Sequence, residues 1–285
     1  MRRLHFSVAL RHPVMGVTSR SGYLIEGPAG WGECSPLASW SDAERQAAER
    51  SADEAATMPF PTALRDRVAV NAMVPRLPPD VAAALALSSG CATIKVKVGD
   101  AQSLDRVAAV RSACGPHVKI RLDANGAWDL ETAIRMLAQL AVYDIELVED
   151  PIATLEELAT LRGRTVLPVA AESCIRTTAD ARRLRQLGAA DAIVLKPQRI
   201  GGVREALRAA EESGVPAIAS SALETSVGLA AVVALAASLP DAPFAHGVGT
   251  ALLLASDVVS DPLIPVDGWL TPRRPSVDLH LLVTA

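Results

Sequence analysis

The sequence predicts an α/β protein built on a (β/α)7-8 TIM-like barrel with an α+β capping domain. The first observation is a repeat: five apolar, strand-like runs end at or beside charged residues that lie about 25 residues apart, the length of one strand, one helix and two short loops. The runs are rich in Val, Ile, Leu and Ala, as in buried parallel strands that carry chemistry at their C-terminal ends. The chain has 285 residues and is 50% hydrophobic, which suits one barrel of roughly 200–250 residues plus an appendage.

Residues 1–60 are expected to form the N-terminal part of the capping domain. Two strands are predicted, at Leu4–Leu10 and Gly22–Glu26. A polar loop, Val17–Ser21, is predicted between them. Ser41 is followed three residues later by Glu44, a capping-box pattern that opens an Ala-rich helix. Prolines at Pro59 and Pro61 mark a linker after this helix.

Residues 61–251 are expected to form the barrel, in which strands alternate with helices. The predicted strands are Val68–Val74, Thr93–Val98, Val118–Asp123, Ile145–Glu149, Val166–Glu172, Ala192–Lys196, Ala217–Ser220 and, as an eighth, Phe244–Gly247. The predicted helices are Leu104–Ala113, Leu130–Val142, Thr154–Leu161, Thr178–Leu187, Val203–Ser213 and Val227–Leu239. Residues 252–285 are rich in proline and contain no further repeat, so this segment is expected to pack back on the capping domain.

Composition and charge exclude several classes of protein. The net charge is −4, and no basic stripe suggests nucleic acid. The four cysteines form no C-x-x-C pair, which favours reduced thiols in the cytoplasm. No signal peptide is expected, because Met1-Arg2-Arg3 is followed by a mixed, strand-like segment rather than a continuous apolar run. No membrane span is expected, because the most apolar tract, Ser226–Leu239, falls short of the roughly 20 residues that a span needs. A small-molecule partner is therefore expected, with no obligate protein partner.

The charged residues are predicted to share one mouth of the barrel. Side chains alternate along a strand, so Lys95 and Lys97 point to the same side. In a ring of eight strands the second and sixth lie opposite each other, which places Lys97 and Lys196 across the cavity. Asp123, Glu149 and Glu172, from the three strands between them, line the arc.

This arrangement indicates metal-assisted proton abstraction. Three convergent carboxylates repel one another unless a cation neutralises them, and an all-oxygen set suits Mg²⁺. A lysine beside that ion and near a second lysine has its ammonium form disfavoured, which makes a neutral amine available as a base. The set suits removal of a proton α to a carboxylate, with the metal stabilising the resulting negative charge.

Several motifs resemble the enolase superfamily, muconate-lactonizing subgroup. They are Lys95-x-Lys97, Asp123-x-Asn125, Glu149-Asp150-Pro151, an acidic residue after the fifth strand, Lys196-Pro197, and Gly30-Trp31-Gly32-Glu33-Cys34-Ser35-Pro36 of the capping domain. The resemblance implies that Asp123, Glu149 and Glu172 are Mg²⁺ ligands, with Mn²⁺ as a substitute. It also implies that Lys97 and Lys196 flank the substrate.

The fifth strand departs from the family pattern, which usually reads Asp-Glu-Ser where this chain reads Ala171-Glu172-Ser173. Aligning the downstream Ile-Arg pair places Glu172 at the ligand Asp. Aligning Glu-Ser instead leaves Ala171 there and only two carboxylate ligands, so the first alignment is preferred. Asp150 and Glu146 flank Glu149 and are weaker candidates for the same role.

The loops Ser220–Ser226 and His246–Thr250 resemble those of the o-succinylbenzoate synthases of this subgroup. That likeness implies syn dehydration of 2-succinyl-6-hydroxy-2,4-cyclohexadiene-1-carboxylate, a step towards menaquinone. Lys97 would act as base and then acid, Lys196 would stabilise the intermediate, and Lys95 would support the carboxylate and depress the Lys97 pKa. Expected substrate contacts or positioning groups are Asn125, Ser221, Gly247 and Arg20, the last in a lid loop.

Three alternatives remain open from the sequence. N-acylamino acid racemases and dipeptide epimerases of the same subgroup use a similar lysine pair. A Schiff-base aldolase would use Lys196 without three carboxylates. A barrel that serves as a non-catalytic scaffold would show no Mg²⁺-dependent turnover.

Overall fold

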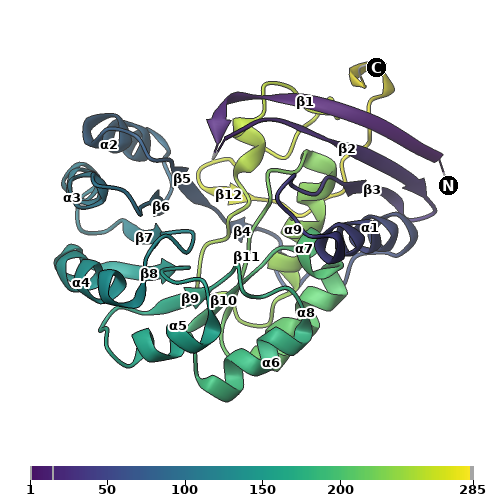
Figure 1. The fold of residues 1–285 in the computed structure, drawn as a ribbon. Helices are drawn as coiled ribbons and strands as arrows, with labels where there is room; N and C mark the ends of the chain where they lie inside the picture. Colours follow the sequence, from purple (N-terminus) through teal and green to yellow (C-terminus); the bar gives the residue numbers. More distant parts are fainter. Residues whose placement is uncertain (1, 15, 283–285) are drawn as a thin grey trace.

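The structure is a computed structural model that describes residues 2–14 and 16–282. It has two parts, a small antiparallel sheet with one helix, and a curled parallel sheet surrounded by helices (Figure 1). The small sheet has the order β1-β2-β3. Its elements are β1 (Arg2–Val14), β2 (Val17–Gly27), β3 (Gly30–Cys34) and the helix α1 (Asp42–Thr57).

The predicted loop at Val17–Ser21 is wrong, because these residues open strand β2. Arg20 pairs with Val8 of β1 and is buried, whereas its neighbours Ser19 and Ser21 are exposed. The stretch is polar because one face of this sheet meets solvent, and antiparallel sheets tolerate that arrangement.

Helix α1 begins with the predicted capping box. The Ser41 side chain accepts from the Glu44 backbone, and the Glu44 side chain accepts from the Ser41 backbone. The helix lies close against the sheet, because its inner face carries alanines and β3 has a glycine opposite them. A Cβ at Gly32 would overlap the carbonyl oxygen of Ala52.

The large sheet contains seven parallel strands that run in sequence order from β5 to β11. The strands are β5 (Asn71–Val74), β6 (Thr93–Lys97), β7 (Lys119–Asp123), β8 (Ile145–Glu149), β9 (Val169–Ala171), β10 (Ala192–Leu195) and β11 (Ala217–Ala219). The helices are α2 (Pro79–Ser88), α3 (Ser103–Cys114), α4 (Leu130–Leu140) with η1 (Ala141–Tyr143), α5 (Leu155–Arg162), α6 (Thr178–Leu187), α7 (Pro197–Ile200), α8 (Val203–Ser213) and α9 (Ser226–Ser238). The predicted barrel is confirmed.

The eighth predicted strand, Phe244–Gly247, makes only isolated bridges. His246 pairs with Val70, and Gly247 pairs with Ser220, so this segment joins the first and last strands of the parallel sheet. The ladder is irregular because the Nδ1 atom of His246 accepts the hydrogen bond of the Ala219 backbone N–H, at 3.1 Å. A side chain therefore takes the place of a backbone acceptor at this closure.

The segment after the barrel contains η2 (Thr250–Leu253), β12 (Trp269–Leu270) and η3 (Leu279–Leu281). Strand β12 pairs with β4 (Val68–Ala69), and Leu254 forms an antiparallel bridge with Leu10 of β1. Figure 1 shows this yellow segment beside the purple N-terminal strands. Side chains of the two segments share an apolar cluster, which includes Phe6, Val8, Leu10, Leu254, Val258 and Val259. The predicted boundaries 1–60, 61–251 and 252–285 stay predictions.

Within the described residues, no helix combines the length and the apolar character that crossing a membrane requires.

Candidate active site

The predicted charged residues meet at the C-terminal ends of five neighbouring strands. Lys95 and Lys97 lie on β6, Asp123 ends β7 and Glu149 ends β8. Strand register places Lys97, Asp123 and Glu149 side by side. Glu172 follows β9 by one residue, and Lys196 follows β10 as the N-cap residue of α7.

On the β6–β8 side, the lysines bind the carboxylates directly. Lys95 Nζ lies 2.5 Å from Glu149 Oε1 and 2.8 Å from Asp123 Oδ2. Lys97 Nζ lies 2.5 Å from the same Asp123 oxygen and 2.8 Å from Asn125 Oδ1. All four charged side chains are buried. This half of the site is a closed cluster of two ammonium groups and two carboxylates.

On the β9–β10 side, Glu172 has two cationic partners. Its Oε2 atom lies 2.7 Å from Lys196 Nζ, and its Oε1 atom lies 2.9 Å from Arg199 Nη1. The Nε atom of Arg199 lies 2.6 Å from Glu44 Oε1 on the capping helix. Sequence reasoning missed Arg199, although its position three residues after Lys196 on a helical turn was a usable signal. It identified Glu44 only as part of a capping box.

Asp150 fixes the backbone of the loop that carries Glu172. Its carboxylate accepts from the backbone N–H groups of Glu172 at 2.7 Å and Ser173 at 2.8 Å. Asp150 itself has a left-handed backbone, with φ of 44°. Burial and the adjacent carboxylates of Glu172 and Glu149 raise its pKa to about 7. Glu146 lies elsewhere and is paired with Arg121 and Lys119.

The pKa values of the two lysines of β6 are shifted in opposite directions. Burial lowers the pKa of Lys97, and the neighbouring Lys95 ammonium adds to that effect. Burial alone would lower the pKa of Lys95 as well, but its contacts with Asp123 and Glu149 raise it. Lys95 is thus held as a cation, while the pKa of Lys97 lies below the ordinary lysine value.

The carboxylates are also perturbed. Although burial opposes it, the two adjacent ammonium groups of Lys95 and Lys97 hold the pKa of Asp123 below its usual value. Burial raises the pKa of Glu149 despite its contact with Lys95, and the negative charges of Asp123 and Glu172 contribute to the increase. Burial and the neighbouring carboxylates thus both disfavour the ionised form of Glu149.

The three carboxylates at this mouth are oxygen ligands of the kind that a hard cation such as Mg²⁺ prefers. Asp123, Glu149 and Glu172 are all buried, all offer oxygen, and all lie at the C-terminal ends of adjacent strands. Among residues 2–14 and 16–282, no three His, Cys, Asp or Glu side chains converge as ligands of one ion. Each of these three carboxylates is instead paired with a lysine.

Three of the expected substrate contacts lie at this mouth. Asn125, with φ of 51°, accepts from Lys97, and its backbone N–H donates to Asp123 Oδ1 at 3.0 Å. The backbone N–H of Ser221 donates to the Gly247 carbonyl at 3.0 Å, and the Gly247 N–H donates to Ala219. Barrel closure therefore already engages these two backbone N–H groups. The hydroxyl of Ser221 is hydrogen-bonded to that of Thr250, at 2.6 Å.

Arg20 does not lie in a lid loop. It projects from strand β2, is buried, and donates to the backbone carbonyls of Ser35 and of Leu223, the latter at 3.1 Å. Leu223 has φ of 66°, a strained conformation for a residue with a Cβ. Arg20 thus stabilises the loop after β11 from the capping domain.

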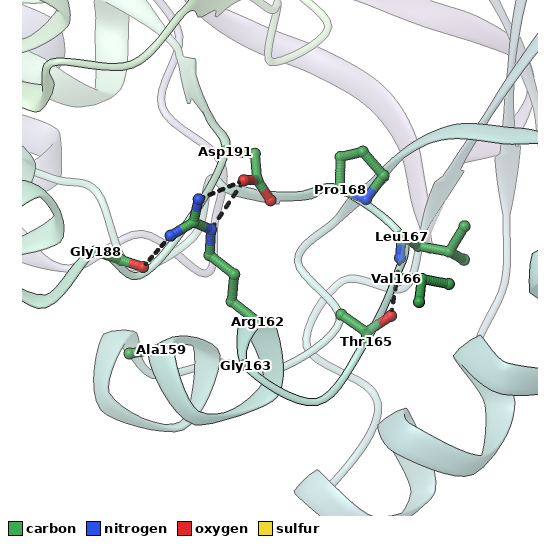
Figure 2. Close-up of a pocket in the computed structure, with 9 residues that line it drawn as sticks. All are labelled: Ala159, Arg162, Gly163, Thr165, Val166, Leu167, Pro168, Gly188 and Asp191. Atoms are coloured by element: carbon green, nitrogen blue, oxygen red, sulfur yellow. Dashed lines mark hydrogen bonds and ion pairs between the residues drawn. The ribbon is translucent and has the colours of Figure 1, made fainter.

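A surface pocket of about 350 Å³ lies away from this mouth, around the start of β9 (Figure 2). Figure 2 shows Arg162 paired with Asp191 and directed to the Gly188 carbonyl. None of the candidate catalytic residues lines the pocket. It does not contribute to the site at the C-terminal ends of the strands.

Comparison with known proteins adds independent findings. Residues 80–275 match the family described as enolase C-terminal domain-like, and residues 5–56 match the family described as enolase N-terminal domain-like. The chain is 50% identical to o-succinylbenzoate synthase from Thermobifida fusca, over 95% of this chain and 87% of that protein. It is 42% identical to o-succinylbenzoate synthase from Mycolicibacterium smegmatis, over 95% of this chain and 85% of that protein.

Two solved structures share the fold at low sequence identity. Dipeptide epimerase from Enterococcus faecalis superposes with a TM-score of 0.84 at 22% identity, covering 97% of each chain. Muconate lactonizing enzyme from Pseudomonas fluorescens superposes with a TM-score of 0.85 at 20% identity, covering 98% of this chain and 96% of the other.

Proposed function

The chain belongs to the enolase superfamily, and from that premise we propose that it is an o-succinylbenzoate synthase. The reaction would be Mg²⁺-dependent syn dehydration of 2-succinyl-6-hydroxy-2,4-cyclohexadiene-1-carboxylate to 2-succinylbenzoate, on the route to menaquinone. The observation that carries the proposal is 50% identity to such a synthase over 95% of the chain. The paired lysines and carboxylates at the mouth of the barrel supply the required chemistry.

Lys97 is the proposed base. Its lowered pKa makes proton loss easier than in an ordinary lysine, and the neutral amine can accept the ring proton next to the substrate carboxylate. The C–H electron pair then forms the new ring double bond as the C–O bond breaks. The hydroxyl leaves with the proton that Lys97 returns, so one water molecule is released and the ring becomes aromatic.

The other lysines act through charge. Lys95 is held as an ammonium between Asp123 and Glu149, and its charge contributes to the lowered pKa of Lys97. Lys196 is proposed to face the substrate from the opposite side, where its ammonium group would stabilise negative charge and contact the ring by a cation–π interaction. Asn125 would orient both Lys97 and Asp123, which it contacts through its side chain and its backbone.

Asp123, Glu149 and Glu172 are the proposed holders of Mg²⁺, and Mn²⁺ is a proposed substitute. Bound there, the ion would supply positive charge to the substrate carboxylate and to the charge that develops on its oxygens. The burial of all three carboxylates at the C-terminal ends of adjacent strands supports the assignment. Ser221, Gly247 and Arg20 remain proposed contributors to the substrate pocket, with Arg20 acting through the Leu223 loop. A cytoplasmic location also stays a prediction.

Ultraviolet-monitored turnover of the cyclohexadiene substrate tests this proposal. Purified protein should form the aromatic product with Mg²⁺, lose activity in EDTA, and regain it when Mg²⁺ or Mn²⁺ is restored. Absence of product in the presence of Mg²⁺ would contradict the synthase assignment.

Racemisation or epimerisation of an amino acid derivative is the second candidate. It is favoured by lysines that approach the mouth from strands β6 and β10, because two bases on opposite faces can remove and return a proton. Exchange of the α-proton in deuterated water, measured by NMR with N-succinylamino acids and dipeptides, tests it. The ion pair between Lys196 and Glu172 argues against a Schiff-base aldolase, which needs a free amine there.

A further inference from the structure

We propose that Arg199, anchored by Glu44 of the capping helix, is a positioning residue that fixes Glu172 for Mg²⁺ binding. By holding Oε1 of Glu172, it leaves Oε2 available for the ion once Lys196 releases that oxygen. The inference rests on the proposed function, because it concerns the proposed metal ligand.

The position of Arg199 follows from a short helix. Lys196 is the N-cap residue of α7, Pro197 starts the helix with a fixed φ, and the left-handed Gly201 ends it. Arg199 therefore lies one turn after Lys196, and both side chains reach the same carboxylate. The Arg199 side chain is only 14% exposed, so its two carboxylate contacts are largely shielded from solvent.

Glu44 is itself immobilised. Its Oε2 atom accepts from the Ser41 backbone N–H at 2.8 Å and from the Ser41 hydroxyl at 2.7 Å, within the capping box. Its Oε1 atom is therefore presented to Arg199 from a fixed place, at 2.6 Å. The guanidinium is planar and forked, so fixing one of its N–H groups also fixes the direction of the others.

The charges along this line alternate. Glu44 neutralises Arg199, so the guanidinium orients Glu172 without leaving an uncompensated positive charge near the ion. The family usually has the shorter Asp where this chain has Glu172, whose additional methylene gives the carboxylate one more rotatable bond. Arg199 removes that freedom.

Mg²⁺ affinity of the substrate-free protein tests the proposal. Isothermal titration calorimetry would compare Arg199→Met and Glu44→Gln with wild type, and Mn²⁺ electron paramagnetic resonance would repeat the comparison. Loss of a group that orients a metal ligand typically weakens binding 10–100-fold, so Arg199→Met should weaken it by about tenfold or more. Glu44→Gln should weaken it by a smaller factor, because Arg199 remains.

Arg176→Ala is the matched control. Arg176 Nε lies 3.5 Å from the same Glu44 oxygen, but its ion pair is with Glu44 rather than with Glu172. The Mg²⁺ affinity of the Arg176→Ala variant should equal that of wild type. A double variant sharpens the test: the shorter side chain in Glu172→Asp should not need Arg199, so adding Arg199→Met to Glu172→Asp should cost little further affinity.

The outcomes separate the inference from the proposed function. Unchanged or tighter Mg²⁺ binding by folded Arg199→Met would overturn the inference, because Arg199 would then only join the two domains or compete with the ion. If Arg199→Met does not fold, as judged by circular dichroism, unchanged affinity in Glu44→Gln would overturn it instead. Weakened Mg²⁺ binding by Arg199→Met, together with no turnover of the cyclohexadiene substrate by wild-type protein, would support the inference and contradict the synthase assignment. Failure of wild-type protein to bind Mg²⁺ would contradict both.

Discussion

The two halves of the site are held in different ways. On the β6–β8 side, Lys95, Lys97, Asp123 and Glu149 contact one another from adjacent strands in matched register. On the β9–β10 side, Glu172 is tied through Arg199 to the capping helix. The first half depends on the barrel alone, whereas the second depends on the docking of another domain.

A second buried connection strengthens this contrast. Gln198, two residues after Lys196, accepts from the Ser35 backbone N–H at 2.9 Å and donates to its hydroxyl at 3.2 Å. The Ser35 hydroxyl donates to Glu33 at 2.5 Å, and Glu33 also accepts from the backbone of Gly228 at the start of α9. The capping domain thus contacts both the helix after Lys196 and the helix after β11.

The largest effect is expected from Lys97→Ala on the barrel side. Synthase turnover should fall by about 10³-fold or more, because one group supplies both the base and the acid. The fold should remain, since Lys95 still neutralises Asp123. Steady-state kinetics beside circular dichroism would check this. Near wild-type turnover would show that another group is the base.

A pH effect on stability is expected from the capping side. Burial raises the pKa of Glu33 from 4.5 to about 7, against the hydrogen bonds from Ser35 and Thr225. Because the folded-state pKa is raised, the contribution of Glu33 is complete below about pH 4.5 and is lost as the pH rises through about 7. The loss should not exceed about 4 kcal/mol.

Urea unfolding at several pH values would compare wild type with Glu33→Gln. The difference in free energy of unfolding between them should change across that window in the stated direction. A difference independent of pH would mean that Glu33 is ionised throughout and is stabilised by its four hydrogen-bond donors.

Gln198→Ala should have an intermediate effect on stability and turnover. It removes the hydrogen bonds that connect the helix after Lys196 to Ser35 of the capping domain. The buried Ser35 N–H loses its acceptor, which should cost about 1–3 kcal/mol of stability. A small displacement of Lys196 should reduce kcat by roughly tenfold. If kcat and stability both match wild type, docking of the capping domain does not position this half.

The smallest effect is expected from Arg162→Ala, in the pocket of Figure 2. The Arg162 side chain is 43% exposed, so its ion pair with Asp191 should contribute no more than about 1 kcal/mol. Turnover should be unchanged. A large loss of kcat here would show that the opposite end of the barrel contributes to catalysis.

The barrel half was predictable from sequence because its information is local. An apolar run that ends in a charge places that charge at a strand end, and alternation places Lys95 beside Lys97. Register, which follows from parallel pairing, then brings these residues together. The structure confirms the predicted barrel, with its parallel strands in sequence order.

The remaining features depend on contacts between distant segments. The partner of Arg199 lies 155 residues earlier in the chain, and no local pattern links it to Glu44. Val17–Ser21 was wrongly predicted as a loop because serine and threonine also suit an exposed strand face. Phe244–Gly247 lacked a regular ladder because the His246 side chain replaces a backbone acceptor, which sequence periodicity does not reveal.

The most direct test of the account is a single-turnover isotope experiment with wild-type protein and Mg²⁺. The substrate would carry deuterium on the ring carbon that bears the carboxylate, and formation of the aromatic product would be followed by ultraviolet absorbance. The account predicts slower conversion than with the protium substrate, because Lys97 must break that bond. Equal rates in the chemical step, or no aromatic product, would contradict proton abstraction as the function of this site.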